Sequence, residues 1–342
     1  MRIYRFFLLC IGFSLFSGIA FAGDVPALTE KGTKFPVSGF WAFSVNTMLA
    51  EGREYVLENG MVLSDLKWPL TPSLSYMLHY GLYFPLGIHL DGNFSIMQTM
   101  RTGAMIDKDF EEANAAAAQQ GITKLSMHKC DIIDGFRSTI KLGLQLPMPQ
   151  TTAMRRSGIS IVAEPMASLH YSLMSWYSYE GYLQYAKQNQ NGGYEPWNKD
   201  LPKLPFSGPA VAYRQLLVIP AIGIGFEAAL PYMLSLFSDF HVNAGIIASA
   251  EDIHYRRDVR FVDIMRGGWA IHGTTRLSWQ CLPYLALFFN LFYEYSVTTE
   301  GRTLVYNGIN SLKPYSHSPP NSAGTALRGC TLSAGFTFLL GR

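Results

Sequence analysis

Long stretches in which apolar residues alternate with small or polar residues constrain the fold of this chain most strongly. In residues 88–98 and 331–338 the apolar side chains take the even positions and the small or polar ones the odd positions. Residues 216–226 alternate in the same way, and in residues 285–297 the apolar side chains take the odd positions. Successive side chains of a β-strand point to opposite faces of a sheet, so this pattern predicts strands with one apolar face.

The length of these stretches favours a transmembrane barrel over a soluble β-sandwich, whose strands alternate too. Several stretches reach about 10 residues or more, and a tilted strand needs ~9–11 residues to cross a bilayer. Aromatic residues make up 14% of the chain and charged residues only 15%. Aromatic residues near the ends of the stretches are typical of the girdles at a membrane surface: Tyr80, Tyr83, Trp176, Tyr213, Tyr284 and Tyr295.

The turn signals predict ten strands and an alternation of short and long connections. Polar segments at 107–125, 187–207 and 307–326 are expected to form extracellular loops, whereas the connections near 84–85, 147–150, 230–231 and 281–283 are short. A sheet in lipid has to close so that no edge is left unpaired. We therefore predict an all-β fold, a ten-stranded antiparallel transmembrane β-barrel with long extracellular loops, formed by residues 23–342 as one domain.

The N-terminus predicts export. Arg2 and Arg5 precede an apolar run over residues 6–22, which ends in Ala20-Phe21-Ala22 before Gly23. This is the pattern of a cleaved signal peptide over residues 1–22. A membrane anchor is the alternative, but the run is short for a span and contains glycine and serine residues.

Charge and cysteine usage exclude several classes of protein. Arg2 and Arg5 belong to the signal peptide, so the exported chain is close to neutral and gives no electrostatic reason to expect nucleic-acid binding. Its cysteines, Cys130, Cys281 and Cys330, offer neither a disulfide framework nor a zinc-binding spacing. We expect a monomer whose neighbours are membrane lipids.

Two pairs of ionisable residues are candidates for catalysis. Asp107 and Asp109 follow the third predicted strand, and Asp252 and His254 end the seventh. Residues two apart on a strand share a face. A histidine oriented by a carboxylate can take a proton from water near neutral pH, and two adjacent carboxylates tend to share one proton. Such pairs are nevertheless often structural ion networks.

The alternation of the strand predicts inward side chains for the first pair but outward side chains for the second. Asp107 and Asp109 continue the odd, polar face of residues 88–98, so both should point inward if no bulge intervenes. In the seventh strand Asp239 and His241 mark the odd positions as inward, whereas the second pair is even. A β-bulge within residues 245–251 would repair the mismatch. Alternatively, the strand has left the membrane and the lipid rule no longer applies.

These residues lie in segments that resemble the omptin family of outer-membrane endopeptidases. Residues 54–57 and 64–68 look like the first omptin hairpin, and residues 101–110 resemble the segment with the paired aspartates. Residues 213–224 and 251–255 are similar to the strand upstream of the aspartate–histidine pair and to that pair itself. The resemblance covers most of the exported chain and implies a ten-stranded outer-membrane barrel with an active site facing the extracellular side.

The resemblance also implies roles for single residues. His254 would be the general base, oriented by Asp252, and would share the attacking water with Asp107. Asp109 would pair with Asp107 to hold a proton, and Glu54 would bind substrate, although Glu51 competes for that assignment. Neither a metal nor a cofactor is implied, no covalent intermediate is expected, and the partners would be peptides or proteins at the cell surface.

Several residues depart from the family pattern. Ala250 stands where an acidic residue is expected, and a second acidic position falls near Lys124, so we expect a weaker preference for paired basic residues in the substrate. The positions of the arginines that grip lipopolysaccharide match His170 and Leu216, and leucine cannot bind a phosphate. We therefore expect that activity does not depend on lipopolysaccharide.

The main alternative function is a non-catalytic barrel of the same fold that acts as an adhesin, or host-protein binder, or as a narrow pore. Altered pocket residues would suit a scaffold with a new role. The presence of both candidate pairs favours the enzyme. A lumen lined by residues such as Asp91 and His241 would also make a poor general pore.

Overall fold

The computed structural model describes residues 38–340, apart from residues 60, 111–120, 189, 191–193 and 244. The predicted signal peptide, residues 1–22, and most of the predicted loop at 107–125 lie outside the described residues. Within the described part, no helix is both long and apolar enough to cross a membrane.

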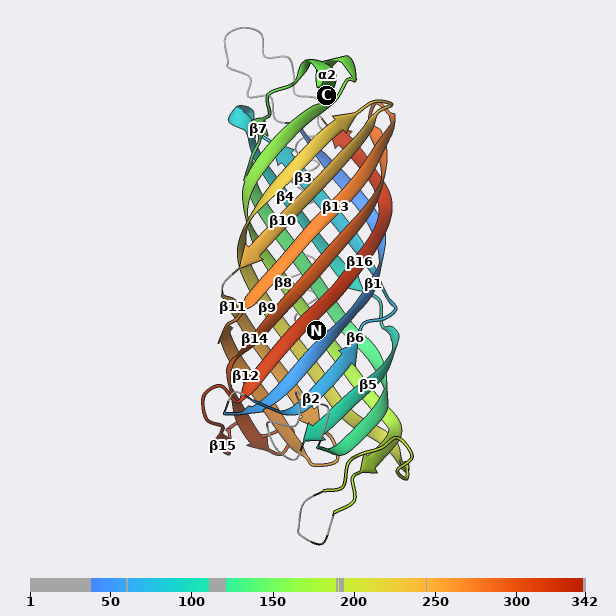
Figure 1. Cartoon of the computed structure of the whole chain (residues 1–342), viewed down its shortest axis with the longest axis vertical. Helices are drawn as coiled ribbons and strands as arrows, with labels where there is room; N and C mark the ends of the chain where they lie inside the picture. Colours follow the sequence, from blue (N-terminus) through green and yellow to red (C-terminus); the bar gives the residue numbers. More distant parts are fainter. Residues whose placement is uncertain are drawn as a thin grey trace. The chain divides into compact units, whose positions relative to one another are not determined.

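The described strands form one antiparallel sheet that closes on itself (Figure 1). β1 (Ser38–Glu58) pairs with β16 (Ala323–Leu340) on one side and with β2 (Met61–Pro69) and β3 (Ser73–Tyr83) on the other. The ring continues through the remaining long strands: β4 (Ile88–Met97), β5 (Met100–Phe110), β6 (Ile122–Leu144), β8 (Ser160–Tyr185), β9 (Leu204–Leu230), β10 (Leu234–Asn243), β11 (Ile246–His254), β12 (Val259–Gly267), β13 (Trp269–Leu282) and β14 (Leu285–Asn307).

Four neighbouring pairs of strands continue one another across short breaks: β2 and β3, β4 and β5, β10 and β11, β12 and β13. The remaining elements are short: η1 (Pro85–Gly87), β7 (Leu146–Pro147), α2 (Thr152–Arg156) and β15 (Ser316–His317). The predicted all-β antiparallel barrel is confirmed. The count of ten depends on whether each interrupted pair is taken as one strand, and it stays a prediction.

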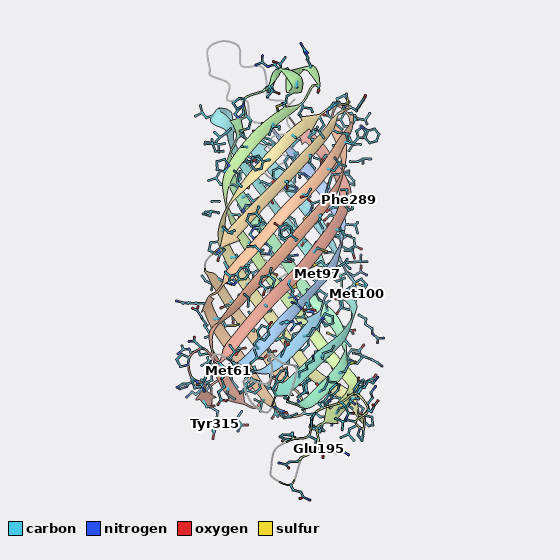
Figure 2. The ribbon with its side chains drawn as sticks, in the orientation of Figure 1. Met61, Met97, Met100, Glu195, Phe289 and Tyr315 are labelled. Carbon is cyan, nitrogen blue, oxygen red and sulfur yellow. The ribbon has the colours of Figure 1, made fainter. Side chains whose placement is uncertain are left out.

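The two faces of the sheet follow the alternation in the sequence. Large apolar side chains face outward on β10, β13 and β14, where Phe240, Leu277 and Phe289 are exposed, and Figure 2 shows Phe289 on the outer face. Small and polar side chains of the same strands face inward, as at Asn290 and Ser296. The alternation therefore separates a lipid-facing exterior from a polar interior.

Charged side chains fill the interior between these strands. Arg137 on β6 donates a hydrogen bond of 2.6 Å to Glu294 on β14, and both side chains are at most 8% exposed. Lys141 pairs with Asp239, and His79 Nε2 lies 2.7 Å from Asp91 Oδ2. Each of these buried charges thus has a partner of opposite sign, which offsets the cost of removing it from water.

An aromatic layer closes the interior toward one end of the barrel. Trp68 on β2 stacks on Tyr213 of β9 with the ring centroids 5.1 Å apart, and Trp176 of β8 lies 5.7 Å from Tyr213. All three side chains are buried. The prediction that Trp176 and Tyr213 belong to a surface girdle is therefore wrong, because both residues occupy inward positions of their strands and pack across the barrel.

The barrel has two dissimilar ends (Figure 1). η1, α2 and the short β9–β10 and β13–β14 turns lie at one end, and β2, β5, β11, β12 and β15 lie at the other. On the outer face at this second end, Glu51 binds Arg53, Lys67 and Arg328. Because such a charged network suits water rather than lipid, this end projects beyond the apolar band.

Loss of one partner in the buried ion pair tests how the interior is stabilised. Arg137→Met leaves the Glu294 carboxylate without its partner, so we expect the free energy of unfolding to fall by about 3–5 kcal/mol. The double variant Arg137→Met with Glu294→Met removes both charges, and most of the loss should be recovered. Urea unfolding of the refolded barrels measures both values. Equal losses in the single and double variants would contradict this account of the interior.

Candidate active site

Asp107 and Asp109 lie on a paired strand, not in a loop. β5 continues to Phe110, and Asp107 stands opposite Leu66 of β2 and Ser126 of β6. The predicted loop boundary at residue 107 is therefore wrong, because pairing with β2 and β6 extends the strand above the membrane. Neighbours on both sides fix the two carboxylates more firmly than a loop would.

The inward direction of this pair depends on a bulge at Gly103. The register between β5 and β6 shifts between Arg101 and Gly103, whose φ of 117° few side chains tolerate. Inward positions are odd at Met97, even at Thr102 and odd again at Asp107. The predicted inward orientation is confirmed. The inward face switches from odd to even positions at the β4–β5 break and back to odd positions at the bulge.

Three side chains bind the carboxylate of Asp107. Its Oδ1 accepts a hydrogen bond from Ser64 Oγ at 3.2 Å, and its Oδ2 accepts from Ser126 Oγ at 3.2 Å and from Lys124 Nζ at 3.0 Å. Lys124 also donates to Asp109 Oδ2 at 2.8 Å. The lysine at the position expected to be acidic thus bridges the two aspartates.

Asp252 and His254 point inward from β11. His254 Nε2 lies 2.6 Å from Asp252 Oδ2, and its ring packs edge-on against Phe261 at a centroid distance of 5.4 Å. The parity change that brings them inward falls before Ile246, at the break between β10 and β11. With Nε2 held by the carboxylate, Nδ1 is the ring nitrogen left to accept a proton.

The two pairs face each other across the mouth of the barrel. β9, β8 and β6 separate β11 from β5 along one arc of the ring. Both pairs nevertheless line one groove of about 950 Å³, together with Glu54 of β1. The five candidate residues that lie far apart in the sequence are therefore brought together in the fold.

Asp263 of β12 is a member of the groove that the sequence did not reveal. It stands directly opposite Ala250 of β11, and like Glu54 it is 4% exposed. Among the described residues, Glu54 Oε2, Asp252 Oδ1 and Asp263 Oδ1 have no hydrogen-bond partner. The carboxylate missing at position 250 is thus supplied by the neighbouring strand, so the predicted loss of acidity in the groove is largely offset.

Burial and mutual repulsion shift the titration of these carboxyl groups. Burial, followed by the charges of Asp252, Asp263 and Asp107, raises the pKa of Glu54 well above its usual value. Burial and the charge of Asp252 raise the pKa of Asp263 to about 7. Burial and the charge of Asp109 also raise the pKa of Asp107, against the opposing effect of Lys124. Asp263 therefore exchanges a proton near neutral pH.

The two positions assigned to lipopolysaccharide point in different directions. Leu216 lies on the outer face of β9, as expected. His170 lies inside the barrel, where its Nδ1 is 2.9 Å from Thr139 Oγ1, because the even positions of β8 face inward. The assignment of His170 to the exterior is therefore wrong. The expectation about lipopolysaccharide now rests on Leu216 alone and stays a prediction.

Among the described residues, no three histidine, cysteine, aspartate or glutamate side chains stand close enough to hold a metal ion together. The groove holds an aspartate–histidine pair on one wall and two aspartates bridged by a lysine on the other. Two further buried carboxyl groups lie beside them.

A solved structure of a known protein has the same architecture. A search of the curated proteins finds no match. The crystal structure of outer membrane protease OmpT from Escherichia coli covers 91% of this chain and 99% of its own, with a TM-score of 0.74 and 16% identity. The outer membrane protein OprG from Pseudomonas aeruginosa gives a TM-score of 0.39 and 6% identity, and the match covers 90% of this chain and 98% of that one.

The likeness to OmpT shows the fold, and a family model shows the family. The model of the Omptin family matches residues 40–340, which is almost the whole of the described barrel. The predicted localisation in the outer membrane is confirmed with it. The chain belongs to the Omptin family of outer-membrane β-barrel proteins.

Proposed function

We propose that this outer-membrane protease is an endopeptidase that cleaves peptide bonds with a water molecule activated between Asp252–His254 and Asp107–Asp109. The observation that carries the proposal is the convergence of the two pairs, from opposite walls, on one groove. The groove lies at the end of the barrel that projects from the apolar band, where it is open to peptides outside the cell.

His254 acts as the general base. The hydrogen bond between its Nε2 and Asp252 fixes the ring. The carboxylate also stabilises the imidazolium that forms when Nδ1 takes a proton from water. The resulting hydroxide attacks the peptide carbonyl, and the imidazolium then gives its proton to the departing amine. Because water is the nucleophile in these steps, no covalent bond forms between enzyme and substrate.

Asp107 holds the other side of the attacking water. Hydrogen bonds from Ser64, Ser126 and Lys124 fix its carboxylate, which leaves lone pairs to accept a hydrogen bond from that water. Asp109 is the more exposed member of the pair and stands nearer the solvent. The pair thus orients the water toward His254 and shapes the site for the tetrahedral intermediate.

Glu54 and Asp263 form a pocket for a positively charged substrate side chain. Both carboxyl groups are buried, and each has an oxygen without a partner among the described residues. A lysine or arginine side chain would supply the missing hydrogen bonds and the opposite charge. The expected substrates are therefore peptides or unfolded proteins with a basic residue beside the scissile bond.

The structure gives little support to the pore alternative. The aromatic layer of Trp68, Trp176 and Tyr213 lies under the groove, and the ion pair of Arg137 and Glu294 crosses the interior below it. Measured conductance in a planar bilayer would separate a pore from an enzyme. An adhesin would bind host proteins and leave them intact.

Removal of the base tests the mechanism. His254→Ala leaves no group beside Asp252 to accept the proton, so kcat should fall by about 10²–10⁴-fold. Refolded protein is incubated with a diverse peptide mixture, and the cuts are mapped by mass spectrometry. His317→Ala, on the exposed strand β15, is the matched control and should retain full activity. Wild-type cleavage by both His254→Ala and Asp107→Ala would rule out the proposed mechanism.

Neutralisation of the pocket tests the substrate class. Glu54→Gln removes a buried carboxyl group that can ionise beside a bound cation, so kcat/KM for peptides with a basic residue at the cut should fall by about 30-fold or more. Peptides with a neutral residue there should be affected much less. Glu180→Gln, an exposed change on β8 outside the groove, serves as the control. Equal losses for basic and neutral peptides would contradict this pocket.

The pocket also makes stability depend on pH. The folded pKa of Asp263 lies above the value of about 4 expected for an unfolded aspartate. Its contribution to stability is therefore present in acid and is lost as the pH rises through about 7. Asp263→Asn removes this loss, so its Tm relative to wild type should rise by several degrees between pH 5 and pH 8. The exposed change Asp200→Asn should show no such trend, and a pH-independent difference for Asp263→Asn would refute the account.

A further inference from the structure

Lys124 is a charged group of the groove with no catalytic step assigned to it. It extends from β6, and its side chain is 18% exposed. Its ammonium donates to Asp107 Oδ2 at 3.0 Å and to Asp109 Oδ2 at 2.8 Å. One cation therefore lies between two carboxylates that would otherwise repel each other.

We propose that Lys124 is a positioning residue for peptide hydrolysis, whose ammonium group holds Asp107 and Asp109 together in their ionised form, facing the attacking water. The inference rests on the proposed function and extends it. It replaces the expected proton shared between the two aspartates by a fixed internal cation.

The geometry supports this role over that of a surface ion pair. The serine hydroxyls of Ser64 and Ser126 bind Asp107 from the flanking strands β2 and β6, so the carboxylate that Lys124 contacts cannot turn away. The pKa of Lys124 is raised, because the charges of Asp107 and Asp109 outweigh the effect of its burial. The lysine therefore stays charged over the whole pH range in which His254 can act as a base.

The surrounding charges make a counter-ion necessary. The carboxyl groups that line the groove with the aspartate pair are Glu54 and Glu58 from β1, Asp252 from β11 and Asp263 from β12. The other cationic or titratable side chains in this lining are Tyr55, His254 and Arg257. Lys108 and Asp65 lie on the outer face of β5 and β2. Without Lys124, carboxyl groups would dominate the groove, and a proton would be taken up at the pair.

A protonated pair would be a poor partner for the attacking water, because a neutral carboxylic acid is a weaker hydrogen-bond acceptor and leaves the water less oriented. Lys124 thus sets the lower pH limit of catalysis.

The test compares kcat/KM from pH 5 to pH 9 for wild type, Lys124→Met, Lys124→Arg and Lys108→Met, with a peptide identified by cleavage mapping. In Lys124→Met the acidic limb of the profile should move to higher pH by about 1–3 units. Lys124→Arg keeps the charge and should stay close to wild type, and Lys108→Met, a lysine on the outer face, should match wild type.

A profile of Lys124→Met that is lowered equally at all pH values would overturn the inference, because a merely structural role predicts that result. An acidic limb that moves as far in Lys124→Arg as in Lys124→Met would also overturn it. Lys124→Gln, which keeps a hydrogen-bond donor but no charge, replaces Lys124→Met if the methionine variant does not fold.

Thermal unfolding separates this inference from the proposed function. The Tm loss of Lys124→Met should grow from pH 5 to pH 8, because the unpaired carboxylates ionise over that range. A loss independent of pH would refute the role of Lys124 even if no substrate is found. If wild type cleaves no peptide but the Tm loss follows pH as expected, the proposed protease function fails and the pairing of Lys124 with the aspartates stands.

Discussion

The pairing of β1 with β16 is the interaction on which the rest of the structure depends. It runs from Gly39 opposite Leu340 to Val56 opposite Ala323 and closes the ring of strands. In lipid, an unpaired strand edge costs several kcal/mol for each exposed backbone group, so a sheet that did not close could not remain in the membrane. Closure also fixes which strands face each other across the interior. The groove exists because the ring holds β5 and β11 on opposite walls.

The interior divides the molecule into a part that stabilises it and a part that carries its chemistry. Below the aromatic layer, buried carboxylates are paired with cations, as Glu294 is with Arg137 and Asp239 is with Lys141. Above it, three buried carboxylate oxygens have no partner among the described residues. A fold tolerates unsatisfied polar groups mainly where a ligand completes them. The unpartnered carboxyl oxygens, gathered beside the two candidate pairs, distinguish the groove from the ion pairs that also line the barrel.

The sequence predicted the barrel because its signal is local. Alternation within one strand shows which face is apolar, without any knowledge of neighbouring strands. The same local rule failed wherever the answer depended on a partner strand or a bulge. Asp263 could be assigned to the groove only from its register opposite Ala250. The switch of the inward face at Gly103 could be found only from the pairing of β5 with β6. Trp176 was assigned to the surface because aromatic residues near strand ends suit a girdle and an interior layer equally well.

The central claim is that two side-chain pairs from opposite walls act on one water molecule. A crystal structure of the wild-type protein with a phosphinic peptide, which mimics the tetrahedral intermediate, tests it most directly. The account predicts that one phosphinate oxygen lies within hydrogen-bonding distance of His254 Nδ1 and of Asp107, with a basic side chain of the peptide beside Glu54 and Asp263. A phosphinate group bound away from either wall, with His254 or Asp107 making no contact to it, would contradict the account.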